Sequence, residues 1–138
     1  MSFNLVRTIQ PIVTDMRNVY KLCAEEFCKY YYATYDSNFN NLWSVYYTDS
    51  QFTYLDSEMV GFDNLCNGLR LNGVLKFTHN NLVITAQPVG SAHLLITVVG
   101  TVAFNDTIFQ NKFIETLLLH RHDSNRLYVC NTIFKLTD

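Results

Sequence analysis

The amino-acid sequence predicts an α+β fold, with helices and one short strand in its first half and a sheet of long strands in its second half. Four runs rich in β-branched and aromatic residues are typical of strands: Phe77–Val89, His93–Phe104, Phe109–Arg121 and Arg126–Thr137. The turn segments between them are rich in Gly, Pro, Asn, Asp and Ser: Pro88–Ser91, Asn105–Thr107 and Asp123–Asn125. Strands joined by such short turns predict an antiparallel meander.

The first half supplies the helices. Apolar residues recur every three or four positions from Ile12 to Tyr31, which predicts an amphipathic helix of about twenty residues. The elements predicted after it are a short helix over Phe39–Tyr46, a short strand over Gln51–Leu55, a turn at Asp56–Glu58 and a helix from Phe62 to about Leu71. Gly73 is well placed to end that last helix.

Length and composition predict one domain over residues 1–138, with residues 1–10 as a possible flexible lead-in. The chain is 49% hydrophobic and 16% charged, and its net charge is −2. This balance gives no general attraction to nucleic acid or to anionic membranes. No apolar run is long enough to cross a membrane as a helix, and the first residues lack the apolar core of a signal peptide.

The four cysteines, at positions 23, 28, 66 and 130, include no Cys-x-x-Cys pair. Each occupies a place where a small apolar residue would serve, so we expect buried free thiols, as in a reducing compartment. The ligand spacing of a metal site is absent, and the sequence predicts no metal and no cofactor.

Both faces of the predicted strands are apolar, although an antiparallel sheet normally turns one polar face to water. The helices of the first half can cover one face only. We therefore expect another protein to cover the second face. The candidate interface residues on that face are Thr97, Val99, Thr101, Ile114, Thr116, Leu118, Val129, Asn131 and Ile133. Without a partner they would form an apolar patch larger than soluble monomers usually expose.

Four segments carry a resemblance to a known family: Ala24–Asp36, Ile84–Pro88, Val99–Phe104 and Tyr128–Lys135. In order and spacing they resemble the nuclear transport factor 2-like family over about Cys23–Leu136. The residue sequences of these segments are most similar to the small subunit of the mRNA export receptor heterodimer. The last segment also resembles the N-terminal domain of stress-granule scaffold proteins. The resemblance implies a cone in which a strongly curved antiparallel sheet packs on three helices.

The resemblance also implies partners. It implies pairing with a second domain of the same fold through the outer sheet face, as a heterodimer rather than a homodimer. Carriage of GDP-bound Ran is disfavoured, because Phe52–Leu55 lacks the family's Trp and acid, and Asn105–Thr107 keeps one carboxylate of the cluster. The implied location is the nucleus, the cytoplasm and the nuclear pore. The N-terminal region 1–22 is longer than the family pattern requires.

Aromatic and apolar side chains are expected to line the inside of the cone: Tyr31, Tyr35, Trp43, Tyr46, Phe113, Leu117 and Phe134. Such residues at helical spacing are usually core. The alternative is a groove for Phe-containing peptides such as the Phe-Gly repeats of nucleoporins.

Glu115 is a weak candidate catalytic base, since this fold also hosts isomerases and dehydratases with a carboxylate inside the cone. A desolvated carboxylate has a raised pKa and can take a proton. The alternative is a buried Glu that is hydrogen-bonded to backbone or to a Tyr hydroxyl. The small basic patch His120–His122 with Arg126 is expected to be a solvated turn rather than an RNA site.

The function favoured by these patterns is a non-enzymatic nuclear-transport adaptor, the small subunit of an mRNA export heterodimer that helps to bind Phe-Gly nucleoporins. The competing hypotheses are a homodimeric carrier of Ran-GDP, a peptide-binding scaffold domain and a small-molecule isomerase or dehydratase that uses the cone pocket.

Overall fold

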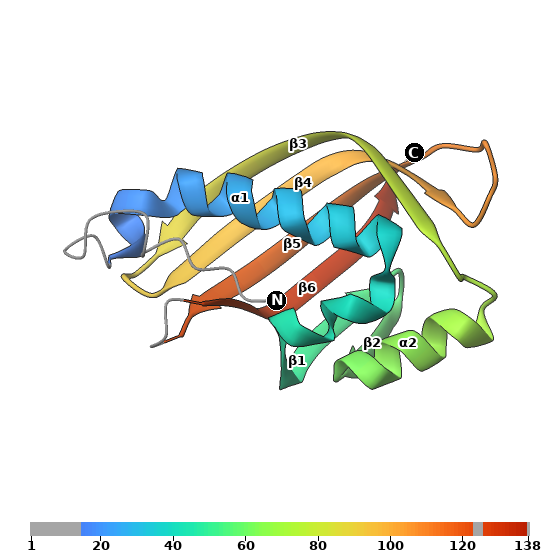
Figure 1. The fold of residues 1–138 in the computed structure, drawn as a ribbon, viewed down its shortest axis with the longest axis horizontal. Helices are drawn as coiled ribbons and strands as arrows, with labels where there is room; N and C mark the ends of the chain where they lie inside the picture. Colours follow the sequence, from blue (N-terminus) through green and yellow to red (C-terminus); the bar gives the residue numbers. More distant parts are fainter. Residues whose placement is uncertain (1–14, 123–125, 138) are drawn as a thin grey trace.

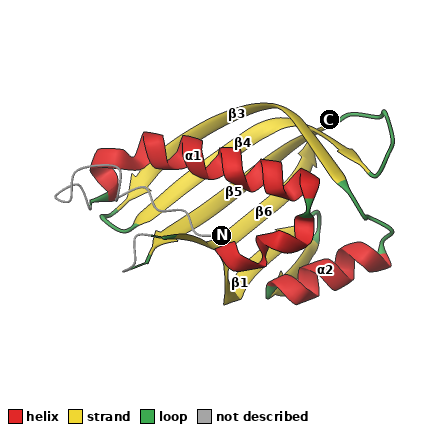
Figure 2. Ribbon diagram, in the orientation of Figure 1, coloured by secondary structure: helices red, strands yellow, loops and turns green. Residues whose placement is uncertain are grey.

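A computed structural model describes residues 15–122 and 126–137 (Figures 1 and 2). The elements in chain order are α1 (Met16–Ser37), the 3₁₀ helix η2 (Phe39–Val45), β1 (Tyr46–Tyr54), β2 (Ser57–Val60), α2 (Phe62–Leu71), β3 (Phe77–Val89), β4 (His93–Phe104), β5 (Asn111–Arg121) and β6 (Leu127–Thr137). The predicted lead-in and the predicted turn at 123–125 lie outside the described residues.

The strands form one sheet in the order β2-β1-β6-β5-β4-β3. The predicted meander β3–β6 is confirmed, with antiparallel pairing throughout. The sheet is nevertheless mixed, because β1 runs parallel to β6. Figure 1 shows α1 lying across one side of this curved sheet, while η2 and α2 lie near β1 and β2. The helices thus cover one face, called the inner face below, and the opposite side of β3–β6 is called the outer face.

The helix α1 buries the residues that its three-and-four spacing selects: Met16, Val19, Cys23, Ala24, Phe27, Cys28, Tyr31, Tyr32 and Tyr35. It begins at Met16, where the Asp15 carboxylate accepts a hydrogen bond from the backbone N–H of Arg17 at 2.9 Å. The predicted start at Ile12 lies outside the described residues.

The segment after α1 is a 3₁₀ helix and not the predicted α-helical turn. A 3₁₀ helix repeats every three residues, so positions 39, 42 and 45 share its inner side. Leu42 and Val45 are accordingly buried, whereas Trp43 is 67% exposed. The change of helical period therefore turns Trp43 outward.

The strand β1 is longer than the predicted Gln51–Leu55, and the last two residues of the predicted turn, Ser57 and Glu58, begin a short partner strand, β2. The extra length of β1 includes an irregularity, because its pairing with β6 shifts between Tyr46 and Gln51. Ser50 is buried at this irregularity, and its hydroxyl donates a hydrogen bond to the Val129 carbonyl at 2.5 Å.

The helix α2 has the predicted bounds, and Gly73 follows its C-terminus with a φ of +74°. The N–H of Gly73 donates to the Arg70 carbonyl at 3.1 Å, and the N–H of Val74 donates to the Leu69 carbonyl at 2.9 Å. This left-handed backbone favours glycine and satisfies carbonyls at the helix end.

Two bulges set which side chains of the long strands face inward. In β6 the register shifts between Leu118↔Asn131 and Leu119↔Val129, so Cys130 is an extra residue. A one-residue bulge reverses the alternation of faces beyond it. Val129 therefore lies on the inner face at 0% exposure, and Tyr128 takes the outer face.

The second bulge lies in β3, where the register shifts between Asn80 and Val83 and Asn81 has a φ of +57°. The bulged backbone approaches β4 at Gly100. A Cβ atom built at Gly100 would lie 2.8 Å from the Asn80 carbonyl oxygen. Only a residue without a side chain leaves room for this bulge.

We expect Gly100→Ala to lower the free energy of unfolding by about 1–3 kcal/mol, because the added methyl group meets backbone that cannot move aside cheaply. Urea unfolding measures the change. Gly68→Ala is the matched control, since its Cβ would lie 3.9 Å from the Met59 sulfur within α2 and should raise stability by up to about 1 kcal/mol. Equal stability of the Gly100→Ala variant and the unmodified protein would contradict this account of the bulge.

Candidate functional site: an uncovered sheet face and a closed interior

The outer face of the sheet keeps most of the apolar character predicted for it. Val99 and Ile133 are 40% and 46% exposed. The other predicted face residues that lie on this side are half-buried: Thr97, Thr101, Ile114, Thr116, Leu118 and Asn131. The register places several of them in cross-strand rows, with Thr97 opposite Thr116, Thr116 opposite Ile133 and Val99 opposite Ile114.

Val129 does not belong to this face, and its prediction as an interface residue is wrong. Strict alternation along β6 would place it beside Ile133, but the bulge at Cys130 turns it into the core. Sequence reasoning also missed Tyr128, which the same bulge places on the outer face opposite His120. The sequence carries no clear local signal for this bulge.

The outer face of β3–β6 carries lysine side chains and no carboxylate. Within β3–β6 the one carboxylate is Glu115, and its side chain is buried on the inner face. By strand alternation Lys112 and Lys135 lie on the outer face, in register with Thr101 and Ile114. Asp56 comes within 3.7 Å of Lys135, but it is 98% exposed, and surface pairs of this kind contribute little.

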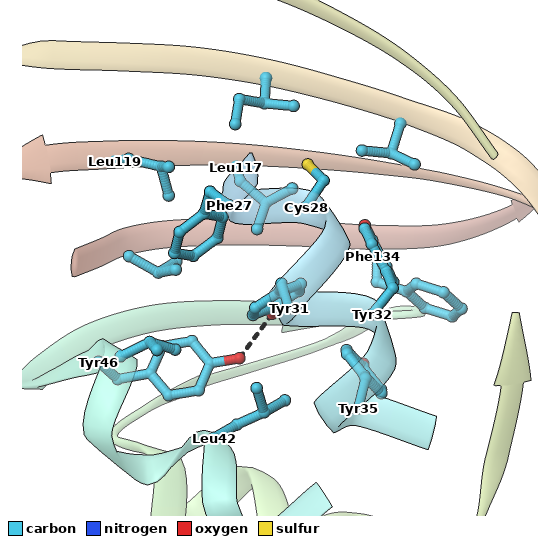
Figure 3. Packing of buried hydrophobic residues seen from close by; sticks show 14 of the residues in the cluster. Phe27, Cys28, Tyr31, Tyr32, Tyr35, Leu42, Tyr46, Leu117, Leu119 and Phe134 are labelled. Atoms are coloured by element: carbon cyan, nitrogen blue, oxygen red, sulfur yellow. Dashed lines mark hydrogen bonds between the residues drawn. The ribbon is translucent and has the colours of Figure 1, made fainter. Parts of the chain in front are cut away.

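The interior of the cone is a packed core (Figure 3). Six of the seven residues predicted to line it are at most 8% exposed: Tyr31, Tyr35, Tyr46, Phe113, Leu117 and Phe134. The hydroxyls of Tyr31 and Tyr46 form a hydrogen bond at 2.6 Å, drawn as a dashed line in Figure 3. Phe113 and Phe134 stack with ring centroids 5.6 Å apart. Binding a peptide among these rings would require them to separate.

Trp43 does not line the inside of the cone, so that prediction is wrong. Its side chain is 67% exposed on η2, for the reason of helical period given above. It lines two surface hollows, one of about 570 Å³ and one of about 350 Å³.

Glu115 lies on the inner face of β5 and is 1% exposed. The hydroxyl of Tyr32 donates to its Oε1 at 2.8 Å, and the hydroxyl of Thr132 donates to its Oε2 at 2.6 Å. Burial raises the pKa of Glu115 above the ordinary range, although these two hydrogen bonds and the charge of His79 act in the opposite direction. Both oxygens are thus occupied in a closed site, which matches a structural Glu and leaves it no access to a substrate.

A second buried polar pair was not anticipated from the sequence. Asp36 at the end of α1 accepts a hydrogen bond from the backbone N–H of His79 at 2.8 Å, and its other oxygen lies 2.6 Å from Nδ1 of the same residue. His79 also packs against the rings of Tyr32 and Phe113. The two residues lie far apart in the chain, so only the folded structure brings them together.

The basic patch expected at a solvated turn is partly built into the surface. His120 is half-buried, its Nδ1 lies 2.8 Å from the Tyr47 hydroxyl, and its ring centroid lies 4.7 Å from that of His93. Partial burial lowers the pKa of His120, and the nearby charges of His93, His122 and Arg121 lower it further.

All four cysteines are free, as the sequence predicts. Burial raises the pKa values of Cys23 and Cys28 to about 12, so these thiols are unreactive. Within residues 15–122 and 126–137, no group of three or more His, Cys, Asp and Glu side chains is arranged to hold a metal ion. In the same ranges, no helix has the length and apolar character needed to cross a membrane.

A curved sheet with helices on its inner face, a closed interior and an uncovered apolar outer face defines a cone-shaped domain suited to pairing with another protein. A family model of the nuclear transport factor 2 (NTF2) domain matches residues 23–136. The chain belongs to this family, as its sequence motifs imply.

Individual proteins agree with the family match. The chain is 30% identical to nuclear transport factor 2 of Debaryomyces hansenii over 115 residues, which cover 82% of this chain and 91% of the relative. The structure of nuclear transport factor 2 from Cryptosporidium parvum superposes with a TM-score of 0.77 and 21% identity, covering 86% of this chain and 95% of that one. The Candida albicans Mtr2–Mex67 M domain complex gives a TM-score of 0.68 and 12% identity, with coverage of 84% and 93%. These likenesses confirm the α+β cone fold and a nuclear-transport type of protein.

We expect Glu115→Gln to change how stability depends on pH. The pKa of Glu115 is higher in the folded than in the unfolded protein. Its contribution to the free energy of unfolding is therefore fully present below the unfolded carboxyl pKa and is lost as pH rises through the folded pKa. Gln keeps the shape and has no charge to bury, so the variant should gain stability relative to the unmodified protein as pH rises, by about 1.4 kcal/mol for each unit of pKa shift.

Urea unfolding at about pH 5 and about pH 8 measures this difference. Glu25→Gln on the exposed side of α1 is the matched control and should follow the unmodified protein at both values. Parallel pH profiles for Glu115→Gln and the unmodified protein would show that Glu115 does not carry a desolvation penalty.

Proposed function

We propose that this protein is a non-enzymatic nuclear-transport adaptor that works as the small subunit of an mRNA export heterodimer. The observation that carries the proposal is the outer face of β3–β6, which is apolar at its centre and is covered by no helix of residues 15–122 and 126–137. Exposed apolar area of this extent marks an interaction surface. The partner is a second domain of the NTF2 fold with its own uncovered sheet face.

The charges of the outer face favour a heterodimer over a homodimer. In a symmetric dimer the same face meets itself, so Lys112 and Lys135 find no carboxylate on the opposing long strands. An unpaired cation at an interface costs free energy, whereas a different partner can place a carboxylate opposite it. The Mtr2–Mex67 complex, to which the chain is similar in fold, is an assembly of two different proteins.

The homodimeric carrier of Ran-GDP is the second candidate, since the curated relatives are named nuclear transport factor 2. The expected acidic cluster is reduced to Asp106, which is 92% exposed and lies 3.5 Å from Lys76. A single solvated carboxylate already near a lysine gives little binding to a basic partner.

An enzyme and a peptide-binding scaffold both lose support in this geometry. An isomerase or dehydratase needs a base that reaches its substrate, and both oxygens of Glu115 are enclosed and hydrogen-bonded. A scaffold or nucleoporin contact through the cone interior needs an open groove, and the interior rings are packed together. Contact with Phe-Gly nucleoporins would therefore be made by a surface of the assembled heterodimer and not by the cone interior of this chain.

The proposed location is the nucleus, the cytoplasm and the nuclear pore.

We expect the double change Val99→Glu and Ile133→Glu to separate the chain from its partner while leaving it folded. Both side chains are about half exposed, so Glu is tolerated in the free chain but places two buried charges in the interface. Light scattering of the copurified complex should show loss of the larger species, and circular dichroism should be unchanged.

The matched control changes two apolar residues of similar size outside the outer face. Leu71 and Leu75 are 88% and 76% exposed beside the end of α2, and changing both to Glu should leave the complex intact. A complex that survives Val99→Glu/Ile133→Glu would remove the outer face as the interface.

The second expected outcome concerns the chain by itself. Without its partner, the purified chain should be a monomer that associates non-specifically at raised concentration, because its apolar face stays in water. Size exclusion with light scattering gives the mass directly. A stable, monodisperse homodimer would contradict the heterodimer and favour the Ran carrier or the scaffold domain.

A further inference from the structure

Trp43 is the single tryptophan of the chain and one of its most exposed large apolar side chains. It lines two surface hollows. The larger hollow, of about 570 Å³, is also lined by Tyr47, Val60, Asp63, Arg126 and Tyr128. The smaller, of about 350 Å³, is also lined by Tyr30, Thr34, Ser37, Asn41 and Ser44. Tryptophan is enriched among the residues that anchor binding surfaces.

Two aromatic rings of the larger hollow are held by contacts within the protein. The rings of Tyr47 and Tyr128 lie 4.8 Å apart and are tilted by 33°. The Tyr47 hydroxyl lies 2.8 Å from Nδ1 of His120. Tyr128 is held in the sheet, in register with His120. Rings that are already held in place lower the entropy cost of binding a ligand.

Trp43 and the linings of the two hollows are called the Trp43 surface below. We propose that this surface binds a proline-rich segment that adopts the polyproline II conformation and contains an acidic residue. The inference does not rest on the heterodimer, because Trp43 lies on η2, although Tyr128 in the larger hollow lies at the end of the outer sheet face.

The aromatic composition of the surface supports the polyproline II conformation. Such a segment has no internal hydrogen bonds and presents proline rings and free carbonyl oxygens along its length. Proline rings pack on aromatic side chains such as Trp43, Tyr47 and Tyr128, and the indole N–H of Trp43, whose side chain is 67% exposed, can donate to a carbonyl. The two hollows on either side of Trp43 match a ligand that is extended rather than helical.

The charges around the larger hollow support the acidic residue. Arg126 supplies the one full positive charge in its lining and is exposed. Asp63 supplies the one carboxylate, but it lies in the first turn of α2, where the helix dipole offsets its charge. A carboxylate on the ligand would pair with the exposed Arg126 guanidinium.

The fluorescence of Trp43 reports directly on this surface, because no other tryptophan contributes. Titration of the full chain with an oligoproline peptide that contains one central Asp should shift the emission to shorter wavelength as the indole leaves water. A Gly-Ser peptide of the same length with the same Asp should give no shift. Replacing Asp by Lys in the oligoproline should weaken binding by about threefold or more.

Calorimetry tests the residues themselves, since variants of Trp43 lack the reporter. Trp43→Ala should weaken the Asp-oligoproline complex by about tenfold or more. Arg126→Ala should remove the preference for Asp over Lys. Leu71→Ala, at an apolar residue that is 88% exposed and lies outside both hollows, is the control and should bind as the unmodified chain does.

Three results would overturn the proposal: no fluorescence shift with either oligoproline, an equal affinity of the Trp43→Ala variant, or a stronger shift with a Phe-Gly peptide or an RNA oligonucleotide. The Val99→Glu/Ile133→Glu chain should bind the peptide normally, so failure of this proposal and failure of the heterodimer are distinguishable.

Discussion

The contact of α1 with the inner face of the sheet is the constraint on which the other features depend. One helix of 22 residues lies along the sheet and buries nine side chains against it. Three of its residues also make polar links to three different strands: Tyr31 to Tyr46 in β1, Tyr32 to Glu115 in β5, and Asp36 to His79 in β3. The helix is thus fixed in position by hydrogen bonds that would be costly to leave unmade in a dry interior.

The interior is closed because its aromatic rings are packed together and buried. Both oxygens of Glu115 are satisfied by the protein itself, although the Tyr54 hydroxyl and His79 Nε2 are buried without a hydrogen-bond partner among the described residues. Because the described helices all lie on the inner face, no helix in the described part of the chain covers the apolar outer face. The proposed function accordingly uses the outer face and not the inside of the cone.

Elements whose apolar residues repeat at a regular helix or strand spacing could be predicted from the sequence. The errors arise where packing between elements changes that spacing. The spacing of three and four selects the buried side of α1, and alternation along β4 and β5 correctly places Val99 and Ile114 on the outer face. In η2 the repeat shortens to three residues, so a residue four positions after Phe39 leaves the interior, which is why Trp43 lies outside. The pairing of Asp36 with His79 depends on how α1 crosses β3, and neither residue type signals it.

The bulge at Cys130 links the two proposed surfaces. By turning Val129 inward it fills the core beneath β1 and shortens the apolar outer face at that end. By turning Tyr128 outward it supplies the ring that packs on Tyr47 and forms part of the larger hollow beside Trp43. Without the extra residue, Tyr128 would point into the core, and the Trp43 surface would lose one of its aromatic rings. The extra residue Cys130 therefore determines where the proposed dimer face ends and where the Trp43 surface begins.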